Sequence, residues 1–401
     1  MHKYVILVHI FIFLTGGIEL MSENQDIQRL LLRARLFLEE GQRDKALMVL
    51  ETIDTENQEQ RQEADYLLAW GYTLAKRWED ALRVLSPLPD LAEDEGEQEN
   101  RIDRGRLAQC FLRLGDTAVN LARYEDAAHH YTKCLKILQD KRIHLPLVQV
   151  KARYGLAMTH VMRELYAAAI QHYELALGLC LHIDDDEIIG NIYYGLSDVY
   201  RRSGNFIKAQ LAGEKALELY ERSGNQHMEG VTRNLLGHIS TQLGDYRQAS
   251  DHFTEALAIA TSCDSTRMVM VNCAALANLR LAEGRLEEAK RYCQRAQEMS
   301  GRFQDKDGQL TGSTYLVTGK VTHAEAQRAE GEQRQKLLEE TIKWFEKAKD
   351  KLAPTQSYAD VAELYGRWAQ VLEELGQFQE AILCWKSGYE ALSSSYGQTW
   401  Y

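Results

Sequence analysis

Two short clusters carry side chains that are able to bind a metal ion. His130 and Cys134 are spaced by one helical turn, which would place both within reach of one metal ion. No second pair of ligands accompanies them, so we predict a surface histidine and a packed thiol. The acidic run 184–187 resembles a Mg²⁺-binding segment, but it precedes Ile188 and Ile189. We therefore predict an acidic helix start that complements the helix dipole.

Catalytic signatures are absent from the sequence. The dipeptide Gly319-Lys320 lacks the glycine-rich loop of a nucleotide-binding site, and no GxGxxG, HExxH, GxSxG or calcium-binding loop occurs. We therefore predict a protein that is not an enzyme, with no catalytic residue, no cofactor and no metal site.

Charge and cysteine usage restrict the partners and the compartment. The chain has 401 residues with 47 Lys and Arg against 59 Asp and Glu, a net charge of −12. Binding to nucleic acid requires a surplus of cations, so we predict no nucleic-acid partner. The seven cysteines are widely spaced and form no CxxC pair, which favours free thiols in the cytoplasm.

Residues 1–20 differ from the rest of the chain. Lys3 precedes an apolar run that ends at Leu14, followed by Gly16 and Gly17, a pattern typical of a short signal peptide. The run is too short for a comfortable membrane span. Alternatively, translation starts at Met21, because the two glycine codons can spell a ribosome-binding sequence. The predictions are a cytoplasmic protein that starts at Met21 or, if residues 1–20 are a signal peptide, an exported one, with no membrane contact unless these residues are translated and retained.

A block of the form Gly-x-aromatic-x-x-Ala recurs along the chain. Clear copies begin at Gly204, Gly244, Gly284 and Gly376, and weaker ones at Gly41, Lys76, Ala122 and Glu164. The final alanines of the central copies, from Ala169 to Ala289, are forty residues apart. Repetition at such a period is the signature of a repeat architecture.

Each repeat predicts two helices. Apolar residues upstream of the block recur at helical spacing, as do Phe253, Ala256 and Leu257 downstream of Ala249. The glycine stands where a helix end needs a left-handed residue. The aromatic residue two positions later is expected to fill the gap between neighbouring helix pairs.

This pattern resembles the tetratricopeptide repeat family, in a long-period form of about forty residues that is similar to several bacterial regulators and peptide-pheromone receptors. The resemblance covers about 370 of the 401 residues. It implies an all-α solenoid of about nine helix–turn–helix units. The small residue of the first helix matches Gly115, Ala157, Ser197, Gly237, Ala277 and Ala369, and the large residue of the second helix matches Tyr131, Tyr173, Phe253 and Trp385.

The spacing of the repeats predicts the organisation of the chain. A hidden eighth unit has Thr341 in place of the alanine, and the long step before it predicts an insertion near 326–335, in the form of an extended loop. The predicted parts are a leader at 1–20, two units at 21–90, an acidic linker at 91–103, five units at 104–301 and two units at 302–401.

In this family the first helix of each unit lines a concave face that binds peptides or partner helices, so the resemblance implies a non-catalytic scaffold or receptor for a protein or peptide. The alternative is the sensor of a bacterial signalling or transcription system that acts through a separate effector. Amides can pair with any peptide backbone, and guanidinium groups with a carboxylate. Counting along the first helices, the residues expected to face the ligand are Tyr154, Asn191, Tyr194, Asp198, Arg201, Arg202, Asn234, His238 and Asn278.

Overall fold

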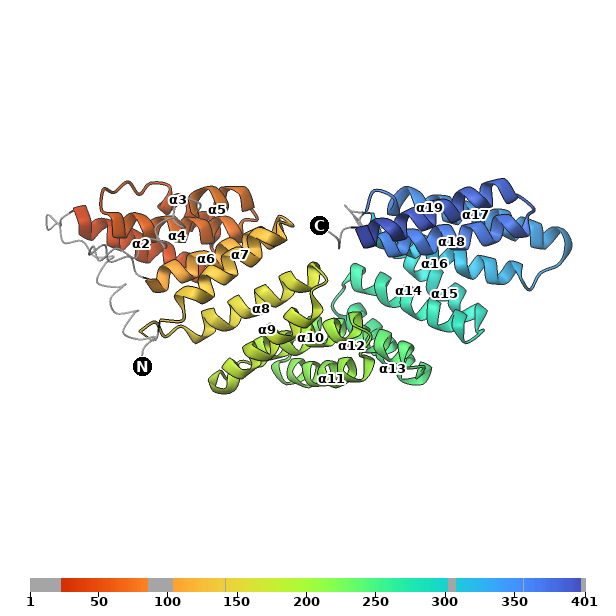
Figure 1. Cartoon of the computed structure of the whole chain (residues 1–401), viewed down its shortest axis with the longest axis horizontal. Coiled ribbons are helices and arrows are strands. Elements are labelled where there is room, and N and C mark those ends of the chain that lie inside the picture. The colour runs from red at the N-terminus through yellow and green to blue at the C-terminus, as the bar shows by residue number, and fades with distance from the viewer. Residues whose placement is uncertain (1–22, 86–103, 141, 302–307, 356, 398–401) are drawn as a thin grey trace. The chain divides into compact units, whose positions relative to one another are not determined.

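The computed structural model describes residues 23–85, 104–140, 142–301, 308–355 and 357–397. The predicted leader at 1–20 and the acidic linker at 91–103 lie outside these residues. Helices are the only regular secondary structure of the described residues, and they are arranged in nine pairs. Figure 1 shows their order along the chain. The helices are α2 (Glu23–Glu39), α3 (Arg43–Leu50), α4 (Gln58–Leu74), α5 (Trp78–Leu85), α6 (Arg104–Asn120), α7 (Tyr124–Ile137), α8 (Pro146–Met162), α9 (Tyr166–Leu179), the 3₁₀ turn η2 (Cys180–His182), α10 (Asp186–Arg202), α11 (Phe206–Ser223), α12 (Gln226–Gln242), α13 (Tyr246–Ser262), α14 (Thr266–Ala282), α15 (Leu286–Ser300), α16 (Gln309–Ala326), α17 (Gly331–Leu352), α18 (Tyr358–Glu374) and α19 (Phe378–Gly397).

The predicted all-α solenoid is confirmed. The first helices α10, α12 and α14 begin forty residues apart, as do the second helices α11, α13 and α15. The chain divides into two compact units, unit 1 up to Thr159 and unit 2 from His160 onward.

Local sequence signals start the central helices. Asp185 accepts a hydrogen bond from the backbone N–H of Ile188 at 3.0 Å and so caps α10, which confirms the acidic helix start. Asn205, Asn225 and Asp245 cap α11, α12 and α13 through the same type of bond. Each cap satisfies a backbone donor that the first helical turn leaves without a partner.

Helices also end as predicted, with a left-handed residue before the second helix. Gly204 has φ = +79° at this position, and its counterparts Gly41, Gly244, Gly284 and Gly376 have φ between +73° and +80°. Three of the weaker copies use residues with side chains there: Lys76, Ala122 and Glu164 have φ of +56° to +58°. An L-residue in this region costs about 1–2 kcal/mol, so the three turns are less favourable than the glycine turns.

Replacement of Ala122 by glycine should therefore raise the free energy of unfolding by about 1 kcal/mol. Ala122 is exposed, so the substitution removes strain without removing core contacts. Gly204→Ala is the matched reverse change, since nothing lies within 4 Å of the added methyl, and it should destabilise by a similar amount. Urea unfolding followed by circular dichroism measures both changes. A change of the same sign in the free energy of unfolding of the two variants would contradict the backbone strain assigned to Ala122.

Within unit 2 the first helices form one layer. Each pairs with the second helix of its own repeat, and that second helix packs on the next first helix. Neighbouring first helices also contact each other directly, as α12 does with α14 and α14 with α16. Among the described residues, the second helices lack comparable contacts with one another. The layer of first helices is therefore the closer-packed side, as expected for the inner face of a solenoid.

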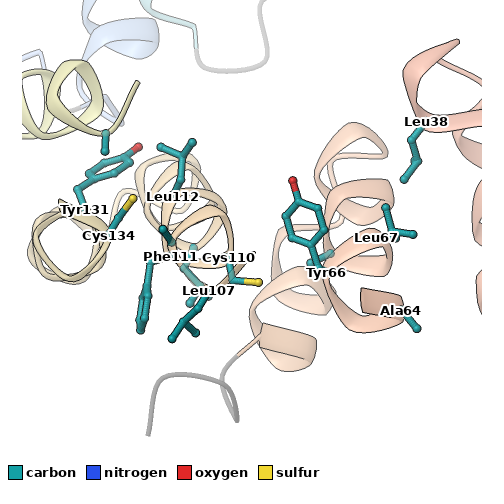
Figure 2. Close-up of a cluster of buried hydrophobic side chains, with 14 of the residues drawn as sticks. Leu38, Ala64, Tyr66, Leu67, Leu107, Cys110, Phe111, Leu112, Tyr131 and Cys134 are labelled. Carbon is teal, nitrogen blue, oxygen red and sulfur yellow. The ribbon is translucent and has the colours of Figure 1, made fainter. Parts of the chain in front are cut away.

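Large aromatic residues in the middle of the second helices fill the gaps between helices. Figure 2 shows Tyr131 of α7 near Leu112 of α6, in the core of unit 1. Its ring lies where a side chain on Gly115 or Gly155 would be, because a Cβ atom at either glycine would fall 2.4 Å from the ring. In unit 2, Phe253 and Phe345 occupy the matching positions.

Two predictions about the repeats were wrong, the first of them in part. The residue two positions after the glycine does not fill a gap in two of the four clear copies, since Tyr246 and Phe378 expose 43% and 63% of their surface. In the other two copies, Phe206 and Leu286 pack against neighbouring helices as expected. The extra residues before the eighth unit do not form an extended loop: α16 continues to Ala326, and α17 begins at Gly331. The strong helix formers Glu, Gln, Lys and Leu lengthen α17 to 22 residues instead.

Candidate functional site

One position recurs on the inner layer of unit 2, directly after the small residue of each first helix. The small residues are buried, because the aromatic ring of the second helix or a neighbouring helix packs on them. The residue that follows each small residue therefore lies at the edge of this helix–helix contact. On α10, α12, α14, α16 and α18 this residue is Asp198, His238, Asn278, Lys320 and Gln370. A row of polar side chains thus follows the five first helices.

The α10 end of the row is charged. Arg201 donates to one carboxylate oxygen of Asp198 at 2.7 Å, and Arg202 donates to the other at 2.7 Å. The two guanidinium groups share one carboxylate, which leaves a net positive charge. Tyr194 lies one helical turn before Asp198, and burial raises the pKa of its hydroxyl. The structure therefore brings Tyr194, Asp198 and both arginines together, with the arginines already held by their own helix.

The asparagines of the predicted set are partly engaged. The Asn191 side-chain oxygen accepts from the Tyr220 hydroxyl at 2.7 Å. The Asn234 amide donates to the side-chain oxygen of Asn272 at 2.9 Å, and Asn272 in turn donates to the Met268 carbonyl at 2.9 Å. Asn191 and Asn234 thus each commit one half of the amide to the scaffold. The other half, a donor on Asn191 and an acceptor on Asn234, is oriented and left for a further partner.

His238 is the member of the row on α12. Its side chain is exposed, while its ring meets Phe253 edge-on with centroids 5.0 Å apart. Desolvation by the surrounding protein, with the Arg201 guanidinium as a second cause, lowers the pKa of His238 to about 4. The imidazole is therefore neutral at pH 7 and presents both a donor and an acceptor.

Asn278 contributes to a cavity of about 560 Å³ between α14, α16 and α18. Its side-chain oxygen is buried and has no hydrogen-bond partner within the described residues. The cavity is lined by Asn278, Leu281, Ala282, Lys320, His323, Ala324, Gln327, Arg328, Arg367 and Gln370. Of these, only Asn278 is among the residues predicted from the sequence. The missed residues Lys320 and Gln370 follow the small residues Gly319 and Ala369, so the same counting rule finds them when it is extended past Asn278.

Tyr154 is the one predicted residue outside unit 2. It lies on α8, in the part of that helix that belongs to unit 1, and is half-buried. Its neighbour in the core is Tyr131, whose pKa is raised by burial and by the carboxylate of Asp116. The other eight predicted residues all lie on first helices of unit 2.

The thiol of the histidine–cysteine pair is packed as predicted, but His130 is half-buried rather than on the surface. Cys134 is buried, burial raises the pKa of its thiol to about 12, and the His130 ring stacks on Phe111 with centroids 6.2 Å apart. Among the described residues, no group of three His, Cys, Asp or Glu side chains lies close enough together to hold a metal ion. All seven cysteines are free thiols, and five of them are buried. In the part of the chain that the structure describes, no helix has both the length and the apolar character to cross a membrane.

Comparison with known proteins identifies the repeats. Family models described as tetratricopeptide repeat match residues 108–139, 149–222 and 232–265. No curated protein matches the chain in sequence.

Solved structures of low sequence identity share the fold over nearly the whole chain. The apo form of RapI aligns with a TM-score of 0.70 at 14% identity, over 92% of this chain and 98% of that one. The apo form of the quorum sensor NprR from B. thuringiensis aligns with a TM-score of 0.64 at 15% identity, over 92% and 99%. A Rap protein complexed with Competence and Sporulation Factor aligns with a TM-score of 0.58 at 13% identity, over 93% and 99%. The TM-scores establish a common fold, and at identities this low the similarity shows the fold alone.

Proposed function

Because the chain is a tetratricopeptide repeat protein, we propose that it is a non-catalytic receptor that binds an extended peptide or protein segment along the first helices of unit 2. The inner layer carries the polar row from Asp198 to Gln370, and amides recur along it. Similar folds include a Rap protein whose structure holds Competence and Sporulation Factor. The net charge of −12 disfavours nucleic acid as the partner.

Two amide side chains of the inner layer carry the proposal. Asn278 on α14 lines the cavity between α14, α16 and α18, and Asn234 on the neighbouring helix α12 is oriented by its bond to Asn272. Amide groups can pair with the backbone of an extended peptide without regard to the peptide's side chains. Affinity then comes from the backbone, and specificity from the charged groups at the two ends of the row.

A mixture of synthetic random octapeptides tests the proposal. Peptides retained by the purified protein are identified by mass spectrometry, and the three strongest are resynthesised for calorimetric titration. The Asn234→Ala, Asn278→Ala variant should bind them about tenfold more weakly, because it loses two backbone contacts. Gln294→Ala, Gln379→Ala is the matched control, since it removes two exposed amides from the second helices α15 and α19. Retention of no peptide by the wild type would contradict the receptor role, and equal weakening by both variants would contradict the assigned surface.

A sensor that passes a signal to another protein is the second candidate function. The similarity in fold to NprR, which is described as a quorum sensor, favours it. This role uses the same first helices of unit 2 and adds a second protein whose binding changes when the peptide is present.

A further inference from the structure

A cavity of about 360 Å³ lies between α15, α16 and α17. Ligand pockets in proteins are typically about 300–1,000 Å³ in volume. On α16, Tyr315 lines this cavity, whereas Lys320 belongs to the polar row, and five residues along a helix correspond to about 140° around its axis. The cavity and the polar row therefore lie on different faces of α16.

The spacing of the lining residues places them on one face of each helix. Trp344, Lys347 and Lys351 of α17 are three and four residues apart, which is the spacing of neighbours on one side of a helix. Thr311 and Tyr315 of α16 are four residues apart. Helix α16 packs on both α15 and α17, so these faces meet beside the last turn of α15.

Two aromatic rings form one wall of the cavity. Tyr315 and Trp344 are both half-buried, and their ring centroids are 5.8 Å apart with an angle of 36° between the ring planes. The two rings contact each other across α16 and α17, and their remaining surface faces the cavity. A flat ring of a ligand can pack on such a surface without any requirement for a particular pattern of hydrogen bonds.

The charged residues of the lining are both lysines. Within the described residues, neither Lys347 nor Lys351 forms an ion pair, and no carboxylate lines the cavity. The Lys347 amine lies 4.2 Å from the centroid of the Trp344 ring. The stem of Lys351 packs on the start of α16, since a Cβ atom on Gly312 would fall 3.1 Å from the Lys351 Cβ. Two unpaired cations at one cavity, in a chain of net charge −12, attract an anion.

The charge of the lysines and the neutral groups beside them favour a phosphate. A phosphate monoester carries about −1.5 to −2 charges at pH 7, which matches two cations better than a carboxylate does. Ser300 and Thr311 line the cavity from α15 and α16, and the Ser300 hydroxyl donates to that of Thr311 over a long distance of 3.4 Å. A hydroxyl can turn toward a charged phosphate oxygen, which accepts a stronger bond.

We propose that this cavity binds an organic phosphate that carries a flat ring, of which a mononucleotide is the simplest representative. Lys347 and Lys351 hold the phosphate together with the Ser300 hydroxyl, and the ring packs on Tyr315 and Trp344. The proposal goes beyond the receptor function, because none of these residues belongs to the polar row and the ligand is not a peptide.

Calorimetric titration of the purified full-length protein tests the proposal. The four ligands AMP, GMP, CMP and UMP are titrated first, and the strongest of them is compared with its nucleoside, with ribose 5-phosphate and with inorganic phosphate. The mononucleotide should bind at least tenfold more tightly than each of the three, because each of them lacks either the phosphate or the ring.

Two pairs of substitutions on α17 locate the bound ligand. Lys347→Gln, Lys351→Gln should bind the mononucleotide at least tenfold more weakly, and its affinity for the nucleoside should stay unchanged. Lys336→Gln, Lys343→Gln is the matched control, since it removes the same charge from exposed positions of the same helix outside the cavity, and it should bind as the wild type does. Circular dichroism of each variant establishes that lost binding does not reflect lost folding, and the comparison of ligands on the wild type stands without the variants.

Three outcomes would overturn the proposal. The first is that none of the four mononucleotides binds at millimolar concentration. The second is that the nucleoside binds as tightly as the mononucleotide, or that both pairs of substitutions weaken binding equally. The third is that Lys347→Gln, Lys351→Gln lowers the melting temperature but binds as the wild type does, because the lysines would then serve only to offset the carbonyl groups at the end of α17.

Discussion

Substitution of Tyr131 by alanine is expected to lower the free energy of unfolding by about 3–5 kcal/mol. The Tyr131 ring is 2% exposed and packs against the backbone of Gly115 on α6 and Gly155 on α8. Its hydroxyl also donates to the Asp116 carboxylate at 2.8 Å. The substitution therefore opens a cavity and removes this donor from the half-exposed Asp116 carboxylate. Urea unfolding followed by circular dichroism at 222 nm measures the change.

The variant Tyr131→Phe separates the contribution of the ring to stability from that of the hydroxyl. It keeps the ring and removes only the bond to Asp116, so it should cost about 1–3 kcal/mol. Two effects act in opposite directions on the pKa of the Asp116 carboxyl: desolvation raises it, and the hydrogen bond from the Tyr131 hydroxyl lowers it. A loss below about 1 kcal/mol for Tyr131→Ala would show that the ring does not fill the gap between α6 and α8.

The same substitution, glycine to alanine within a helix, should have opposite effects at two sites. A Cβ atom on Gly237 would lie 2.5 Å from the Phe253 ring, so Gly237→Ala should destabilise by about 1–3 kcal/mol. Gly178 of α9 is exposed with nothing within 4 Å of such an atom, and Gly178→Ala should stabilise by about 0.5–1 kcal/mol. The difference arises entirely from packing, because helix propensity favours alanine at both sites.

Thermal and urea unfolding of the two variants provide the measurement. The restoring variant Gly237→Ala, Phe253→Leu has a smaller side chain facing the new methyl and should recover part of the loss. Destabilisation of similar size at Gly178 and Gly237 would mean that the ring of Phe253 is not the cause.

Local signals made much of the fold predictable. The helix ends depend on a few adjacent residues, such as Asp185 as a cap and Gly204 in the left-handed region, and these signals act within one turn. The long-period repeat was predictable for the same reason, since each unit repeats the same local sequence pattern. The position of the residues that fill the gaps was harder to predict. Tyr246 and Tyr131 are both aromatic residues of second helices, and only their place along the helix separates an exposed ring from a buried one.

The candidate site was predictable only as a set of helix faces. Counting along the first helices placed Asn234, His238 and Asn278 on α12 and α14 of the inner layer. It did not show that Asn234 is bonded to Asn272, or that Arg201 and Arg202 share the carboxylate of Asp198. These contacts depend on rotamers and on neighbouring helices, which a periodic pattern does not specify.

The sequence by itself thus determined that the chain is a series of helix pairs and where most of these helices begin and end. These properties follow from hydrogen bonds and apolar contacts between residues close together in the chain. Only the tertiary structure decided which polar groups remain without partners and which charges gather around one cavity. Asn278, Lys320 and Arg367 meet there although about ninety residues separate the first from the last, because the stacking of α14, α16 and α18 brings their inner faces together.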